Sequence, residues 1–150
     1  RSIGAVWRGG MGTDIRALLR EELGLYRALK QAAGEQLERI EAGDASGFVE
    51  AADRRDRIQE SISRLDARIG SALRSFPRAA GAGETRAFRE SMRTVVGEIQ
   101  ALDRRASELA ARKRDEASGS LERLRRGRKG VWGYGGSPAP RTPRFIDQKG

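Results

Sequence analysis

The chain contains no cysteine and no histidine. The absence of cysteine excludes disulfides, thiolate nucleophiles and cysteine-ligated metal sites. The absence of histidine removes the commonest metal ligand and the usual general base of enzymes. The paired carboxylates Glu21-Glu22 and Asp115-Glu116 occur among Arg and Lys along helical patterns, and we interpret them as solvated ion-pair residues. We therefore expect no cofactor, no metal and no enzymatic activity.

Aromatic residues are also scarce, and long apolar runs are absent. Aromatic residues make up 5% of the chain, and the mean hydropathy is -0.65. No apolar run approaches the roughly 18 residues of a membrane-spanning helix, and there is no apolar segment typical of a secretory signal. We therefore expect a cytoplasmic protein. Charged residues reach 34%, and Arg, Glu, Ala and Leu are abundant, a composition typical of long helices around a thin core.

The strongest pattern is a heptad repeat between Phe88 and Leu124. Apolar or small residues recur in steps of three and four as far as Leu109. The stripe then changes: Lys113 and Glu116 take the seam positions, and the apolar residues move to Ala117, Leu121 and Leu124. Such spacing places the side chains on one face of a helix that packs against other helices. This helix would be about 55 Å long at its normal rise, so it needs partners along its length.

Two helices are predicted upstream of this repeat. The first begins with Thr13 as its N-cap and ends near Ala42, and the second runs from Ala45 to Phe76. The Gly43-Asp44 pair between them is typical of a helix stop followed by a new N-cap. Because this joint is so short, the second helix must return along the first as a hairpin.

Three residues interrupt the apolar stripes of these two helices. Arg55 stands at an apolar position of the second helix, and Gly24 and Gly34 lie within the first. Each glycine costs about 1 kcal/mol relative to alanine in a helix. Such glycines mark either a close helix–helix approach or simple looseness, and the sequence leaves both possibilities open.

Pro77 ends the second helix, because proline lacks a backbone donor and restricts the residue before it. Residues 77–83 are predicted to be a flexible connection, and Glu84 or Thr85 caps the third helix. The expected architecture is all-α: a long antiparallel helical hairpin and a third long helix run up, down and up in a coiled-coil-like three-helix bundle.

These patterns divide the chain into a flexible leader (1–12), a helical bundle domain (13–126) and a flexible basic tail (127–150). The net charge of +9 comes mainly from the third helix and the tail. Glycines and three prolines in the tail argue against a helix or a central strand there. Its aromatic residues, including Trp132 and Tyr134, are typical of docking motifs, although they could instead fold back onto the bundle.

Several segments resemble FlgN-type flagellar export chaperones. They are Arg20-Glu21-Glu22-Leu23 with Tyr26, the stretch from Leu37 to Asp44, the third heptad helix, and the tail segments Gly133-Tyr134-Gly135 and Arg144-Phe145-Ile146-Asp147. The resemblance implies a cytoplasmic chaperone for type III secretion in flagellum biogenesis. Its expected partners are hook–filament junction proteins (FlgK/FlgL-like) and an FlhA-like export gate. The resemblance implies gate docking through Tyr134, and Trp132 could serve instead.

The resemblance also implies that the third helix binds the amphipathic C-terminal helix of an unpolymerised junction protein. The chaperone would cover the apolar face of that cargo helix. The candidate cargo-binding residues are Val95, Val96, Ile99, Leu102, Leu109, Leu121 and Leu124. The same residues could instead form the core of the chain, whereas Leu121 and Leu124 are expected to be free.

Two other functions fit the residues. The chain could be a nucleic-acid-binding helical protein, in which the basic run Arg112-Lys113-Arg114 and the tail bind phosphates and Trp132 and Tyr134 stack on bases. It could also be a plain coiled-coil scaffold or oligomerisation module, which would assemble without any ligand.

Overall fold

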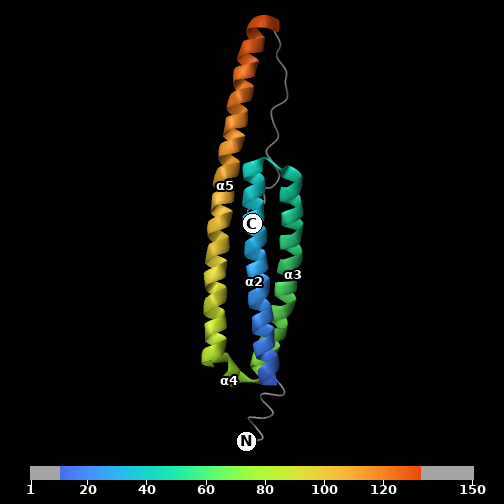
Figure 1. The fold of residues 1–150 in the computed structure, drawn as a ribbon, viewed down its shortest axis with the longest axis vertical. Coiled ribbons are helices and arrows are strands. Elements are labelled where there is room, and N and C mark those ends of the chain that lie inside the picture. The colour runs from blue at the N-terminus through green and yellow to red at the C-terminus, as the bar shows by residue number, and fades with distance from the viewer. Residues whose placement is uncertain (1–10, 133–150) are drawn as a thin grey trace, which may run out of the picture. The chain divides into compact units, whose positions relative to one another are not determined.

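The computed structural model describes residues 11–132, and the side chains of residues 15–128. The described part is built from helices and contains no strand, which confirms the predicted all-α fold (Figure 1). None of the helices in that part is long and apolar enough to cross a membrane. The elements are α2 (Met11–Ala42), α3 (Ala45–Ser75), α4 (Pro77–Ala80) and α5 (Gly83–Trp132).

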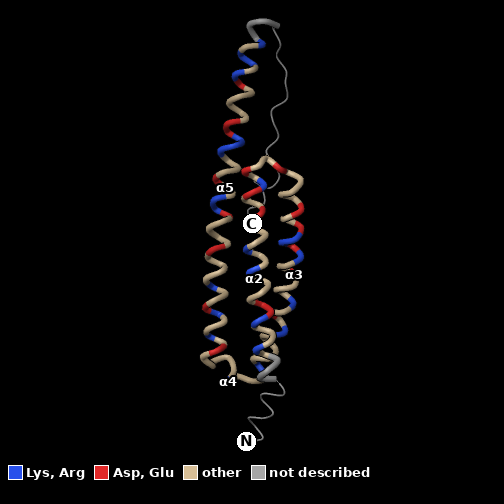
Figure 2. Tube along the Cα trace, viewed as in Figure 1, with Lys and Arg blue, Asp and Glu red and all other residues tan. Residues whose placement is uncertain are grey.

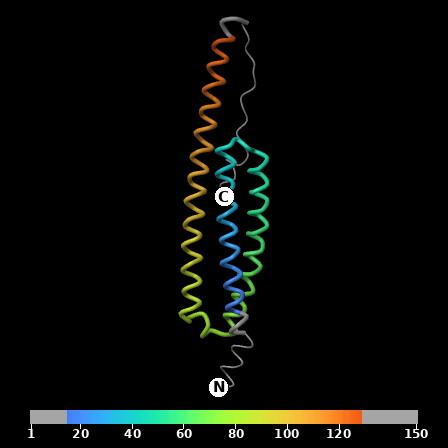
Figure 3. The backbone as a smooth tube through the Cα atoms, viewed as in Figure 1, coloured from blue at the N-terminus to red at the C-terminus, as the bar shows by residue number. Residues whose placement is uncertain are grey.

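The described residues divide into two compact units, with the boundary between Asp103 and Arg104. The first unit contains α2, α3, α4 and the first part of α5, and the second contains the rest of α5. Within the first unit the three long helices lie side by side. There α3 is antiparallel to α2, and α5 again runs in the direction of α2 (Figures 1 and 3). The predicted up-down-up course is confirmed for this unit.

The turn between α2 and α3 is built by Gly43 and Asp44. Gly43 has a φ of +69°, in the left-handed region that residues with a side chain disfavour. Its N–H donates to the Ile40 carbonyl at 3.1 Å, and the Asp44 N–H donates to the Arg39 carbonyl at 2.8 Å. The Asp44 carboxylate then caps α3 by accepting the Gly47 N–H at 2.8 Å. The predicted helix stop and N-cap are therefore confirmed.

The hydrophobic core of the first unit lies along facing stripes of its helices. These stripes follow the predicted steps of three and four residues. Full burial of one Leu or Ile side chain contributes about 1.5–3 kcal/mol, so the stripes provide the main attraction between the helices. The core residues are Ile15, Leu18, Leu19, Leu23, Leu29, Ala33, Ile62, Leu65, Ile69, Ala72, Leu73, Ala79, Met92, Val95 and Ile99.

The connection between α3 and α5 is not the flexible segment that the sequence predicts. Residues Pro77–Ala80 form the single helical turn α4. Pro77 stands at the first helical position, where its missing N–H costs nothing and its fixed φ favours a helix. Ala79 is buried in the core, so packing holds this turn in place. The prediction that Pro77 terminates the preceding helix is confirmed, because α3 ends at Ser75.

The outer ends of the long helices also differ from the prediction. α2 begins at Met11 rather than after Thr13, and α5 begins at Gly83. At its other end α5 continues to Trp132, into the segment predicted to be non-helical tail. Gly127 weakens the helix by about 1 kcal/mol, but adding residues to an existing helix costs much less than nucleating one.

Gly24 and Gly34 do not mark a close helix approach. A Cβ atom added at either position would meet no atom within 4 Å, whereas a Cβ at Gly47 would collide with the side chains of Asp44 and Arg39. The glycines of α2 therefore weaken the helix without serving its packing.

We expect Gly24→Ala to raise the free energy of unfolding by about 0.5–1 kcal/mol, because alanine loses less backbone entropy in a helix. The measurement is urea denaturation followed by circular dichroism. Gly47→Ala is the matched control, and it should give no such gain because its new methyl group disturbs the Asp44 cap. Equal stabilisation by both changes would contradict this assignment.

Candidate functional site

In the first unit, the predicted cargo face of α5 is largely used by the chain itself. Val95 and Ile99 are only 8% and 6% exposed and belong to the core. Leu102 is partly buried and packs against the same core, and Val96 is half-buried. The alternative of an intramolecular core therefore holds for Val95 and Ile99. Their apolar surface is already covered, so it is not free for a cargo helix.

In the second unit, the candidate residues are more accessible. Leu109 and Leu121 are half-buried, and Leu124 is 59% exposed. The expectation of a free side chain thus holds for Leu124 and only in part for Leu121. We call Leu109, Leu121 and Leu124 the distal stripe. A single exposed leucine needs no explanation. Leu121 and Leu124 are three residues apart and so share one face of the helix, and together with Leu109 they offer apolar surface to another helix.

Basic residues are frequent along the part of α5 that carries the distal stripe (Figure 2). Residues 104–128 contain nine Arg or Lys and four Asp or Glu. Arg126 forms an exposed ion pair with Glu122 at 3.8 Å, a type of contact worth less than about 1 kcal/mol. This excess of positive charge favours a partner with acidic residues beside its apolar face.

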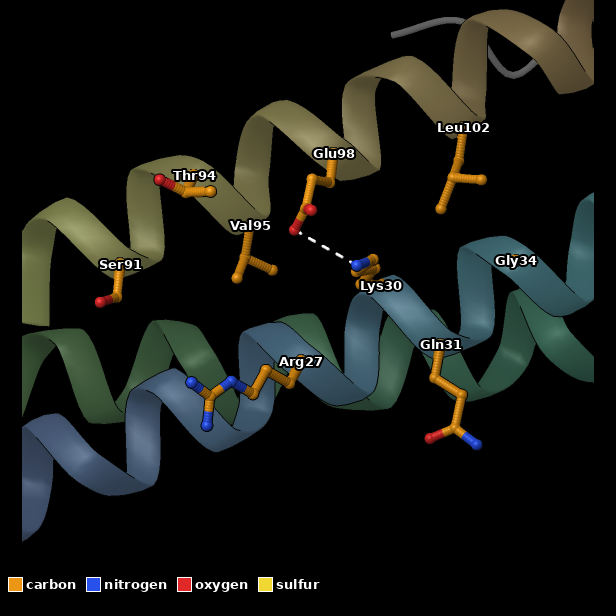
Figure 4. A pocket seen from close by; sticks show the side chains of 9 residues that line it. All are labelled: Arg27, Lys30, Gln31, Gly34, Ser91, Thr94, Val95, Glu98 and Leu102. Carbon is orange, nitrogen blue, oxygen red and sulfur yellow. Dashed lines mark ion pairs between the residues drawn. The ribbon is translucent and has the colours of Figure 1, made fainter.

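A groove of about 700 Å³ lies between α2 and α5 within the first unit (Figure 4). The Lys30 ammonium and the Glu98 carboxylate form an ion pair across it, with a separation of 3.3 Å. Val95 and Leu102 supply its apolar part, and its other lining side chains are mostly polar. The lining residues are Arg27, Lys30, Gln31, Gly34, Ser91, Thr94, Val95, Glu98 and Leu102.

The α2 side of this groove was not among the predicted site residues. Its members Arg27, Lys30, Gln31 and Gly34 recur at helical spacing and so occupy one face of α2. That spacing is a usable signal in the sequence. It predicts a polar border beside the apolar stripe, but it does not tell which helix lies opposite.

The interpretation of Glu21-Glu22 as solvated residues is wrong for Glu22. Glu21 is exposed, but Glu22 is only 4% exposed. Burial, a hydrogen bond with Asp66 and the negative charge of Asp66 raise the pKa of Glu22 to about 8, and Arg89 opposes this shift. The error arose because position 22 falls on the core face of α2, between Leu19 and Tyr26.

The predicted gate-docking residues lie outside the described side chains. Trp132 is the last residue of α5, but its side chain is not described, and neither is Tyr134. Comparison with protein-family models, curated proteins and solved structures finds no match to this chain.

Arg55, which interrupts the predicted stripe of α3, is the centre of a polar cluster in the first unit. Its guanidinium donates to the Gln36 side-chain oxygen at 2.7 Å, and to the two carboxylate oxygens of Asp103 at 2.7 and 3.0 Å. The Arg55 side chain is 17% exposed. Such a two-pronged contact is directional, so the cluster links α2, α3 and α5 at one fixed level along the bundle.

We expect Arg55→Met to lower the free energy of unfolding by about 1–3 kcal/mol, because it leaves Gln36 and Asp103 without their shared donor. The matched control is Arg54→Met, which removes an ion pair with Glu35 whose two side chains are 42% and 33% exposed. That change should cost less than about 1 kcal/mol. Urea denaturation of both variants measures the difference, and equal losses would contradict a special role for Arg55.

Proposed function

We propose that this chain is a FlgN-type flagellar export chaperone. In this role it binds the amphipathic C-terminal helix of hook–filament junction proteins (FlgK/FlgL-like) and delivers them to an FlhA-like export gate. Two things support the proposal. One is the resemblance of the segments from Arg20 to Tyr26 and from Leu37 to Asp44 to that family. The other is the combination of a long helical hairpin with a third long helix.

The distal stripe is the observation that most favours cargo binding. Leu124 is 59% exposed, with Leu109 and Leu121 half-buried on the same helix. An amphipathic cargo helix exposes its own apolar face and would self-associate if left alone. Pairing the two apolar faces removes both from water and yields a shared helical core. Compared with the prediction, the proposed cargo site is narrower, because Val95 and Ile99 already belong to the chain's core.

We expect the double change Leu121→Ser and Leu124→Ser to weaken cargo binding by about tenfold or more, because buried apolar anchors dominate helix–groove affinity. The probe is a synthetic C-terminal peptide of a hook–filament junction protein, measured by isothermal titration calorimetry. The unmodified chain should bind it with a negative heat-capacity change, the mark of apolar burial.

The matched control for this experiment is Val49→Ser. Val49 is also an exposed large hydrophobic residue, at 55% exposure, but it lies on α3. Its replacement should leave peptide affinity unchanged. An undiminished affinity of the double variant, or an equal loss in the control, would contradict the proposed cargo face.

We expect gate docking and cargo binding to be separable. Trp132→Ala and Tyr134→Ala together should reduce binding to the purified cytoplasmic domain of an FlhA-like protein, because large aromatic side chains often anchor interfaces. Peptide affinity should stay the same. Pull-down with the gate domain and calorimetry with the peptide provide the two readings. Retained gate binding would remove the proposed role of these aromatic residues without affecting the cargo site.

A further inference from the structure

Glu22 is a carboxylic acid in the core of the first unit. Only 4% of its surface is exposed, and its neighbours along α2 include the core residues Leu19 and Leu23. Its Oε2 atom is buried without a hydrogen-bond partner. The ion pairs formed by the described residues do not include Glu22. An ionised carboxylate at this position loses its hydration and gains few polar contacts in return. The neutral acid is therefore favoured.

Asp66 of α3 meets Glu22 from the other helix of the hairpin. Asp66 is close enough for a side-chain hydrogen bond to Glu22, and burial, this contact and the negative charge of Asp66 together raise the pKa of Glu22. Ionised carboxylates only accept hydrogen bonds, so this contact requires a proton on one of them. Asp66 is exposed whereas Glu22 is buried, and burial favours the neutral form. The proton therefore resides mainly on Glu22, and the hydrogen bond exists only while that proton is bound.

Two more groups face this pair. Arg89 of α5 is close enough for its positive charge to lower the pKa of Glu22. Tyr26 lies one turn further along α2, and its own pKa is raised by burial and by the charges of Glu22 and Asp66. All three long helices of the first unit thus contribute a titratable or charged group to the surroundings of Glu22.

We infer that Glu22 and Asp66 form a proton-operated switch between α2 and its two neighbours in the first unit. In the protonated state the carboxyl pair links α2 to α3. Loss of the proton converts this link into repulsion between two carboxylates, and Glu22 is then drawn toward the guanidinium of Arg89 on α5. The switch belongs to the body of the fold and does not depend on the proposed chaperone function.

The direction of the pH dependence follows from proton linkage. The pKa of Glu22 is about 8 in the folded chain, against an ordinary value of 4.5. The protonated pair therefore contributes its full stabilisation below pH 4.5, and this is lost as the pH rises through about 8. Between these values each pH unit lowers the folding equilibrium constant by up to about tenfold.

The first test compares the full chain with Glu22→Gln, whose amide can donate to Asp66 without a bound proton. Urea denaturation at about pH 5, 7 and 9 should show the variant gaining in folding equilibrium constant over the unmodified chain as the pH rises, by up to about tenfold per unit below pH 8. Glu21→Gln, an exposed neighbour on the same helix, is the control. It should show no such trend, and an equal trend would overturn the switch.

The protonation of Glu22 can be measured directly by NMR of the carboxyl carbons in a chain labelled at its glutamate residues. One glutamate resonance should titrate near pH 8, and it should be missing in Glu22→Gln. If every glutamate carboxyl titrates in the ordinary range, the switch is overturned whatever the denaturation curves show.

The role of α5 is tested by Arg89→Gln. This change should lower the folding equilibrium constant more at about pH 9 than at about pH 5, because Arg89 attracts only the ionised form of Glu22. In the Glu22→Gln background the effect of Arg89→Gln should be the same at both pH values. A pH-independent effect in the unmodified chain would overturn the exchange of contacts with α5.

Discussion

A single helix cannot bury its own apolar side chains, and in the first unit this constraint determines how α2, α3 and α5 are arranged. The available stripes are narrow, because 34% of the residues are charged and only 5% are aromatic. The core is therefore a set of seams between helices rather than a broad interior. In so thin a core a polar side chain at a seam position has a large influence, because few apolar contacts surround it.

Two polar groups occupy such seam positions and act differently. In the first cluster, the permanently charged guanidinium of Arg55 donates hydrogen bonds to Gln36 and Asp103. These directional bonds specify how α2, α3 and α5 are aligned along their lengths. Glu22 and Asp66 are instead two acidic side chains that lie close together, and their contact depends on a bound proton. Apolar stripes alone tolerate sliding of one helix along another by a turn. Directional polar contacts favour one register over the others.

The parts of the fold that depend on local chemistry could be predicted from the sequence. Gly43 and Asp44 specify a helix stop and a cap through their own backbone and side chain. The hairpin could therefore be predicted from these two residues, without knowing which helices pack together. Whether an apolar face of a helix is buried or exposed does not depend on local sequence. Val95 and Leu124 are both apolar residues of α5, yet one is buried and the other is exposed, because burial depends on which helix lies opposite. The burial of Glu22 could not be predicted for the same reason, because it depends on the helices that pack against α2. The side chains of Trp132 and Tyr134, the predicted gate-docking residues, lie outside the described side chains.

The two-residue joint at Gly43-Asp44 has a consequence for the order of folding. Residues that pack across the α2–α3 hairpin near this joint are close in sequence, so little chain entropy is lost when they meet. Contacts from α5 to α2 span a much longer loop, and topologies with distant contacts form more slowly. During synthesis the hairpin also leaves the ribosome first. Its two helices can thus assemble while α5 is still being translated, and they present a ready template on which the last helix docks.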